Sequence, residues 1–238
     1  LKSGSTKNGI RAAISHTAAI AGTDKIYNAV FKHTGVIRAQ SIDELVDIAG
    51  ALQRQPLPKG RRVGILTSGG GLGVLTADAC ERLNLEIGSL SPQTLEKLDS
   101  LLPDMWSHGN PVDNIGAFNM SLRCLLALME DKNIDAVLTL TMPIYKTSDA
   151  ENLMPDMRPG VMGKEKAQEE LDLQSLELAI KMMDDYRKPI IICNVTVGFG
   201  QPTLVYSRLE QEGILVYPSL ERGVKALAHL VEYSEYLS

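Results

Sequence analysis

Short apolar runs that alternate with long helical stretches constrain the fold of this chain more than any other feature. The runs Val63–Leu66, Ala136–Thr141 and Pro189–Cys193 lack the polar–apolar alternation of a half-exposed strand. Such strands are typical of a parallel sheet that is covered on both faces. Parallel neighbours need a crossover connection, usually a helix. We therefore predict an α/β fold, a doubly wound parallel sheet of about five strands with these three in its centre.

Apolar spacing and capping residues predict the other elements. Ser41-Ile42-Asp43-Glu44 has the form of a capping box and predicts a helix whose apolar side carries Leu45, Ile48 and Leu52. Ser91-Pro92 marks a second helix start, since proline suits the first helical position. Further helices are expected at about 18–33, 73–83, 119–131, 167–186, 201–212 and 219–233, and short strands at 36–38, 85–88 and 215–216.

Three segments are expected to lie outside these elements. Residues 2–11 are polar and contain glycine, which predicts a loop. Residues 53–61 are rich in proline and basic side chains, and we interpret them as a linker at a domain boundary. Residues 142–166 have no regular spacing, and a loop of that length in a compact domain is more often a functional flap or a mobile insertion than scaffold.

Charge and composition exclude several classes of function. The formal net charge of −5 argues against nucleic-acid binding. No apolar run approaches the roughly 18–20 residues that a membrane span requires. Cys80, Cys124 and Cys193 are far apart and lack metal-ligand spacing, so we expect buried thiols, no metal site and a cytoplasmic, reducing location. The chain begins at Leu1 without a methionine, and we expect it to be a fragment of a longer protein.

A histidine between two hydroxyl residues is the first candidate for chemistry. Ser15-His16-Thr17 precedes a run of small residues, and we expect it at the N-terminal mouth of the helix predicted for 18–33. Free N–H groups and a partial positive charge at such a position attract anions. A histidine held at an anion site can act as a nucleophile towards phosphorus. On the local residues alone, a surface histidine near a helix cap is the alternative.

A glycine-rich turn is the second candidate. Thr67-Ser68-Gly69-Gly70-Gly71-Leu72-Gly73 follows a predicted strand and opens a predicted helix, so its backbone amides could approach a phosphate closely. The turn lacks the Lys-Ser/Thr end of a P-loop, because Val74 and Leu75 stand there. The third glycine of a dinucleotide fingerprint would fall on Val74 or Thr76. We therefore assign neither ATP nor NAD to this turn, and a tight turn without a ligand is the alternative.

The remaining polar features are weaker. Asn110-Pro111-Val112-Asp113 is expected at the end of a strand or loop, with an ordinary Asn-Pro turn as the alternative. His33, His108 and His229 have no partner pattern, and we expect surface or capping roles for them. The acidic run around Glu165–Asp172 is most simply a solvated helix face.

Five motifs taken in order resemble one enzyme family. They are Ser15–Gly22, Gly35–Arg38, Pro58–Val63, Thr67–Val74 with Ala77-Asp78, and Asn110–Asp113. Together they resemble the NDP-forming acyl-CoA synthetases of the ADP-forming acetyl-CoA synthetase type, relatives of succinyl-CoA synthetase. The resemblance implies that residues 1–58 are the C-terminal part of one succinyl-CoA-ligase-like flavodoxin domain and carry the phosphohistidine loop. Residues 61–238 would be a second flavodoxin-like domain.

The resemblance also implies a reaction. In that family a histidine of the Ser-His-Thr motif carries a phosphoryl group, and His16 matches it. Phosphate would attack an acyl-CoA to give an acyl phosphate, and His16 would pass the phosphoryl group to ADP; the reverse makes acyl-CoA from acid, CoA and ATP. The phosphate-binding residues would be Ser15, Thr17, Ser68, Gly69, Gly70, Gly71, Leu72 and Gly73. Two helix starts, after His16 and after Gly73, would cradle the phosphohistidine.

Cofactors and partners are implied in the same way. The full enzyme would use CoA, ATP or ADP, and Mg²⁺, bound mostly by a CoA-binding Rossmann domain and an ATP-grasp domain on the same polypeptide or another subunit. The substrate would be a small carboxylic acid, the assembly an oligomer without nucleic acid or membrane, and this chain alone would be inactive. A non-catalytic, synthetase-like half of a protein acetyltransferase and a plain α/β binding module are the alternatives.

Overall fold

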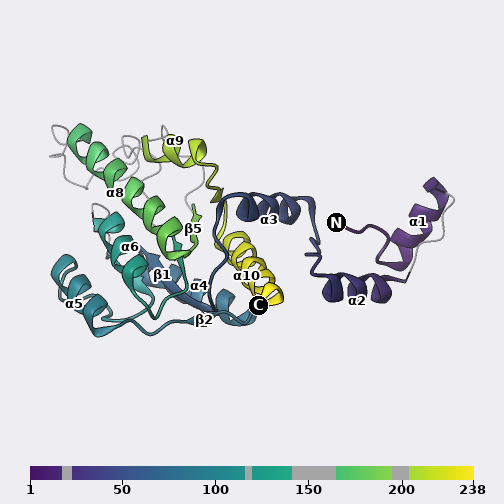
Figure 1. Ribbon diagram of the computed structural model, residues 1–238, viewed down its shortest axis with the longest axis horizontal. Helices are drawn as coiled ribbons and strands as arrows, with labels where there is room; N and C mark the ends of the chain where they lie inside the picture. Colours follow the sequence, from purple (N-terminus) through teal and green to yellow (C-terminus); the bar gives the residue numbers. More distant parts are fainter. Residues whose placement is uncertain (18–22, 116–119, 141–164, 195–203) are drawn as a thin grey trace.

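The three apolar runs form the central strands of a parallel sheet, as predicted. The computed structural model describes residues 1–17, 23–115, 120–140, 165–194 and 204–238. Within these ranges six parallel strands form one sheet, in the order β2-β1-β4-β5-β6 with β3 beside β1 (Figure 1). Their bounds are β1 Arg62–Thr67, β2 Glu86–Ile87, β3 Val112–Asp113, β4 Ala136–Thr139, β5 Ile190–Cys193 and β6 Val216–Tyr217. Without β3 this is the 2-1-3-4-5 order of flavodoxin-like sheets, so the predicted fold class is confirmed.

Helices cover both faces of the sheet. Those that connect or follow the strands are α4 Gly70–Arg82, α5 Pro92–Leu101, α6 Ser121–Glu130, α8 Glu165–Tyr186, α9 Leu204–Gln211 and α10 Leu220–Leu237. Before the sheet lie α1 Lys7–Thr17, α2 Asp24–Thr34 and α3 Ile42–Arg54. The predicted start at Ser91-Pro92 is confirmed: Pro92 is the first residue of α5, and Ser91 accepts a hydrogen bond from the amide of Thr94.

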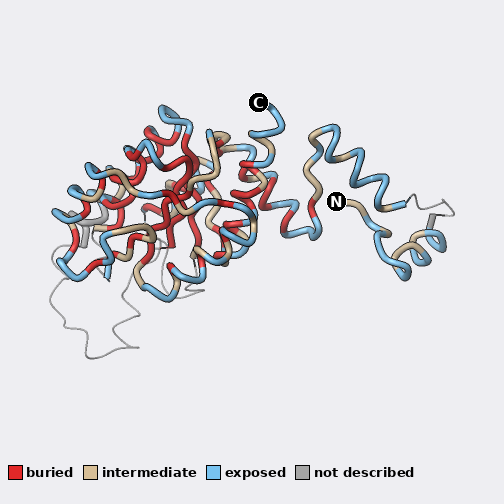
Figure 2. Tube along the Cα trace, turned by 90° about the horizontal axis from the view of Figure 1, so that it is seen from below, coloured by how far each residue is buried: buried red, intermediate tan, exposed pale blue. Residues whose placement is uncertain are grey.

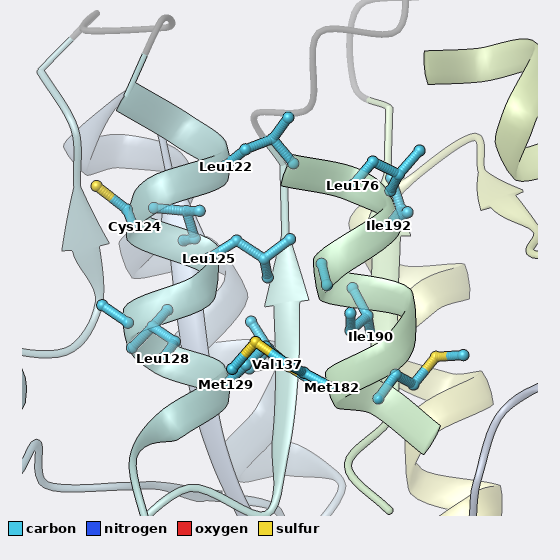
Figure 3. Packing of buried hydrophobic residues seen from close by; sticks show 14 of the residues in the cluster. Leu122, Cys124, Leu125, Leu128, Met129, Val137, Leu176, Met182, Ile190 and Ile192 are labelled. Carbon is cyan, nitrogen blue, oxygen red and sulfur yellow. The ribbon is translucent and has the colours of Figure 1, made fainter. Parts of the chain in front are cut away.

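Alternation along the strands divides the core into two layers. In β5, Ile190 and Ile192 face one layer, which is built with α6 and α8, while Ile191 and Cys193 face the other, which is built with α10. Figure 3 shows the first layer, in which Leu125 of α6 and Leu176 of α8 belong to one buried cluster. Because both sides of each central strand are buried, the strands carry no polar alternation, which explains the apolar runs of the sequence.

The N-terminal helices project from this body. In Figures 1 and 2, α1 and α2 lie to one side of the sheet and are largely exposed. The loop predicted for residues 2–11 is wrong, because α1 begins at Lys7. Thr6 initiates the helix: its Oγ1 accepts from the amide of Gly9 at 3.1 Å, which is the role of an N-cap side chain. Residues 36–38 belong to no strand and pair with no described strand, so the strand predicted there is also wrong.

The third helix packs on the sheet body with a face that apolar spacing did not identify. Ser41 caps α3 as predicted, since its side chain accepts from the amide of Glu44. Leu45 and Leu52 are exposed, whereas Glu44 and Asp47 are buried with Ile48 and Ala51. Of the three predicted apolar contacts only Ile48 is correct, because ionic partners on α10 draw the two carboxylates inward.

The segment after α3 is fixed to the sheet. Gln55 is 7 % exposed, and its side chain donates to the carbonyl of Ile190 and accepts from the amide of Ile190, both at 2.9 Å. The amide side chain thus pairs with β5 as a neighbouring strand residue would. The prediction of a linker over residues 53–61 is therefore wrong for its first residues. The domain division at 58–61 stays a prediction. The flap predicted for 142–166 lies almost wholly outside the described residues.

Candidate functional site

The glycine-rich turn lies at the carboxyl end of β1, where α4 begins. Gly69 is the N-cap residue in an extended conformation and offers no side-chain cap. The hydroxyl of Thr67 donates to the Gly69 carbonyl at 3.1 Å and closes the turn. Gly70 and Gly71 follow in the first turn of α4 and are exposed. The first amides of a helix have no acceptor within it, so they are free to donate hydrogen bonds to an anion.

The space in front of the turn is open. Among the described residues, a Cβ on Gly69 or Gly71 would meet no atom within 4 Å. A Cβ on Gly73 would lie 3.1 Å from Pro111 Cβ and 3.3 Å from Thr67 Cγ2. Gly73 is thus required for packing of α4 against the neighbouring loop, whereas Gly69 and Gly71 leave room for a ligand.

Two more polar side chains reach the same edge because β3 pairs with the end of β1. The register places Asp113 opposite Thr67, and a Cβ on Gly70 would lie 3.5 Å from Asp113 Oδ2. The buried Asn114 follows, and its Nδ2 donates to Ser121 Oγ at 2.9 Å in the first turn of α6. The starts of α4 and α6 are therefore tied to one edge of the sheet, where doubly wound folds bind ligands.

Asn110 proves to be structural. Its Nδ2 donates to the carbonyls of Val63 at 2.7 Å and Gly88 at 2.8 Å, and its Oδ1 accepts from the amide of Ile65 at 2.9 Å. On this edge, β1 pairs with β2 at its beginning and with β3 at its end. The Asn110 side chain bonds to the β1 backbone between these two paired stretches. The sequence predicted this motif at the end of a strand or loop, whereas Val112 and Asp113 themselves form β3, and it gave no signal that the Asn110 amide replaces backbone pairing.

His16 does not lie at a helix start. It is exposed in the last turn of α1, and Thr17 is the last residue of that helix. The Ser15 hydroxyl donates to the carbonyl of Arg11 at 2.9 Å within the helix, so it caps no N-terminus. The predicted position is wrong because the capping residue is Thr6, ten residues earlier than His16. A helix C-terminus carries partial negative charge, which disfavours a bound anion.

The two halves of the predicted site are not brought together. Figure 1 shows α1 at one end of the molecule, away from the sheet that carries α4. Ser68 to Gly73 lie where β1 ends and α4 begins, whereas Ser15, His16 and Thr17 lie in the last turn of α1. Of the two helix N-termini expected to cradle a phosphohistidine, only that of α4 is present as predicted, since α1 presents its C-terminal end at His16.

The other histidines have partners that the sequence did not reveal. His108 Nδ1 lies 2.8 Å from Asp99 Oδ1, and its Nε2 lies 3.0 Å from the carbonyl oxygen of Asp104. The hydrogen bond to Asp104, helped by the Asp99 carboxylate, raises the pKa of His108. His229 Nε2 lies 3.0 Å from Glu44 Oε1, between α10 and α3. His33 is exposed at the end of α2, as expected.

The cysteines are buried as predicted and are free thiols. Burial raises the pKa of Cys80 and of Cys124 to about 12, so neither offers a thiolate at neutral pH. Within the described ranges, no group of three histidine, cysteine or acidic side chains could hold a metal ion. No helix in the same ranges is long and apolar enough to cross a membrane.

Fold and turn together define a class: a flavodoxin-like α/β domain with an open glycine-rich turn at the switch point of its sheet.

Comparison with known proteins shows which of them this chain resembles. Residues 1–52 match the family described as succinyl-CoA ligase like flavodoxin domain. The α subunit of ADP-forming acetate–CoA ligase I from Pyrococcus furiosus is 32% identical over 241 residues, covering 99% of this chain and 46% of the relative. The α subunit of ligase II from that organism is 44% identical over 142 residues, covering 59% of this chain and 31% of the relative.

Solved structures agree with this relationship. The dinucleotide-forming acetyl-coenzyme A synthetase 1 of Ca. Korarchaeum cryptofilum, in complex with phosphate and ADP, has a TM-score of 0.71 and 27% identity. The match covers 99% of this chain and 46% of that one. The resemblance predicted from the motifs is thus confirmed: the chain is related to the ADP-forming acetate–CoA ligases, although it spans less than half the length of these relatives.

Proposed function

We propose that this chain is part of an NDP-forming acyl-CoA synthetase, which interconverts acid, CoA and ATP with acyl-CoA, ADP and phosphate. The observation that carries the proposal is the similarity to ADP-forming ligases over 99% of the chain, which includes both the Ser15-His16-Thr17 motif and the glycine-rich turn. The open first turn of α4 supports it, because exposed helix amides suit a phosphoryl group.

His16 is the proposed phosphoryl carrier. Phosphate attacks the thioester carbonyl, so that CoA leaves as its thiol and an acyl phosphate forms. The imidazole then attacks phosphorus, the carboxylate leaves, and ADP takes the phosphoryl group from the phosphohistidine to give ATP. His16 is exposed and can reach a reaction partner. Because it lies at a helix C-terminus, its phosphorylated form needs positive counter-charge from elsewhere, and the amides at Ser68–Gly73 are the proposed source.

The remaining components belong to other parts of the full enzyme. We propose a CoA-binding Rossmann domain, an ATP-grasp domain and a small carboxylic acid as substrate, with residues 1–58 and 61–238 as parts of two flavodoxin-like domains. Mg²⁺ accompanies ATP in this scheme. The described residues contain no group of three histidine, cysteine or acidic side chains that could hold a metal ion.

Phosphoryl labelling tests the proposal directly. In the enzyme assembled with its ATP-grasp and CoA-binding parts, ATP labelled in its γ-phosphate should leave an acid-labile, base-stable phosphate on this chain, as a phosphoramidate does. His16→Ala should abolish both label and turnover. The matched control is His33→Ala, because His33 is also exposed in the last turn of a neighbouring helix.

Two results would contradict the proposal. A label that persists in His16→Ala would exclude His16 as the carrier and favour a regulatory, non-catalytic relative. Thioester formation by the purified chain alone would contradict the proposed division of labour between domains, since no nucleotide-binding motif is recognisable in it.

A further inference from the structure

The segment that carries His16 joins the sheet body through α3. Helix α3 packs along α10, and α10 packs in turn on α4, the helix that begins at the glycine-rich turn. α1 and α2 project beyond α3 (Figure 1). The position and rotation of α3 on α10 therefore set the point from which residues 1–41 leave the body, relative to the turn at Gly69–Gly73.

The contact between α3 and α10 is close and specific. A Cβ on Gly50 would collide with the side chain of Leu215, so the α3 backbone itself lies against the segment that enters β6. Ala51, one residue further, is 1 % exposed. This part of α3 cannot slide along the body without a steric clash, and Arg54 at its end donates to both carboxylate oxygens of Asp184 on α8, at 2.8 and 3.2 Å. The first half of α3 is held on α10 by a separate feature.

Two buried carboxylates supply that feature. Asp47 is 6 % exposed, and its Oδ2 and Oδ1 accept from Nε and Nη2 of Arg222, both at 2.7 Å. Glu44, one turn earlier, is 8 % exposed and lies 3.0 Å from His229 Nε2 and 3.8 Å from Lys225 Nζ. A bidentate arginine–carboxylate pair fixes orientation as well as distance. The Asp47 carboxylate is buried and the Arg222 side chain is 35 % exposed, and one attested role of ion pairs with a buried member is to select a single geometry.

We propose that Arg222 is a positioning residue for phosphoryl transfer: its bidentate pair with Asp47 fixes the base of the His16 segment relative to the glycine-rich turn of α4. The inference rests on the proposed function. Arg222 contacts no reacting group; it acts through α3. Loss of the pair should therefore reduce the rate at which the phosphoryl group moves, without changing how ATP binds elsewhere in the enzyme.

The test uses the assembled enzyme and four variants. Arg222→Gln leaves the buried Asp47 carboxylate without its partner, and Asp47→Asn leaves the Arg222 guanidinium, whose side chain is 35 % exposed, without its bidentate acceptor. The double variant, Asp47→Asn with Arg222→Gln, leaves no unpaired charge and allows a neutral amide pair. Arg222→Lys keeps the charge but loses the planar fork. The matched control is Arg82→Gln, because Arg82 is exposed on α4 and forms a solvated pair with Asp78 at 3.7 Å.

Three quantities are measured: the single-turnover rate of His16 labelling, KM for ATP, and the denaturation midpoint. Each single variant should slow labelling by about tenfold or more, because misplacement by about an ångström is costly in rate, with KM unchanged. The double variant should recover much of the wild-type labelling rate, and Arg222→Lys should retain part of it. Arg82→Gln should label at the wild-type rate. A merely structural role would change the midpoint and leave the rate per folded molecule unaltered.

The outcomes separate this inference from the function on which it rests. Wild-type labelling in a folded Arg222→Gln enzyme overturns the positioning role and leaves the proposed function standing. The positioning role is also overturned if, in every variant, the labelling rate falls only in proportion to the fraction of folded protein. Absence of label on His16 in the wild type overturns both.

Discussion

Replacing Gln55 by methionine should destabilise the sheet body by about 2–4 kcal/mol. The Gln55 side chain makes two hydrogen bonds of 2.9 Å with the backbone of Ile190, in a place that is 7 % exposed. Methionine has a similar length but cannot replace either bond. Each bond contributes about 1 kcal/mol net, and each buried backbone group left without a partner costs about 1–3 kcal/mol. The range allows for partial relaxation around β5.

Urea denaturation followed by fluorescence provides the assay. Trp106 is the single tryptophan of the chain and is 2 % exposed within the same core layer as Ile190, so its emission reports on the sheet body. Gln53→Met is the matched control, since Gln53 is exposed two residues earlier in α3. The control should change stability by less than about 0.5 kcal/mol, as surface substitutions do.

Gln55→Glu sharpens the prediction. A buried carboxylate can accept from the amide of Ile190 but faces its carbonyl oxygen, so burial should raise the pKa of the new side chain. Stability of this variant relative to wild type should rise as the pH falls through that pKa, because the neutral acid can donate to the carbonyl as Gln55 does. The reasoning is refuted if Gln55→Met costs no more than Gln53→Met, or if the deficit of Gln55→Glu is independent of pH.

Two further predictions concern titration. Burial lowers the pKa of Lys188 to about 8, so the folded chain binds fewer protons than the unfolded chain between that value and the ordinary 10.5. In urea titrations, the free energy of unfolding of the wild type relative to that of Lys188→Met should increase by about 2 kcal/mol between pH 8 and pH 9.5. A difference between the two proteins that does not change with pH would contradict this. The pKa of His108 should lie above its ordinary value in NMR titration, because hydrogen bonds to the Asp104 carbonyl and the Asp99 carboxylate favour the imidazolium. Asp99→Asn should lower it, and an unchanged value would show that Asp99 contributes nothing.

Local sequence signals determined much of the sheet body. The apolar runs gave β1, β4 and β5 as its central strands because burial on both faces leaves a pattern that needs no tertiary information. Ser41 and Ser91 gave the starts of α3 and α5, since an N-cap acts within three residues of its own position. The glycine-rich turn was likewise placed correctly between a strand and a helix, because its strand and helix signals are adjacent in the chain.

Tertiary structure decided the features that depend on residues distant in sequence. The buried face of α3 was mispredicted because Glu44 and Asp47 find cations on α10, more than 170 residues away. Gln55 and Asn110 pair with backbone groups of strands that only the assembled sheet brings near them. The position of His16 was mispredicted for a more local reason. Thr6 caps the N-terminus of α1, so His16 lies in the last turn of that helix and not before the start of the next one. Motif and strand patterns thus indicate which chemistry the chain can carry. Long-range ionic and amide contacts determine where its parts lie, and the sequence did not predict them because such contacts leave no periodic signal.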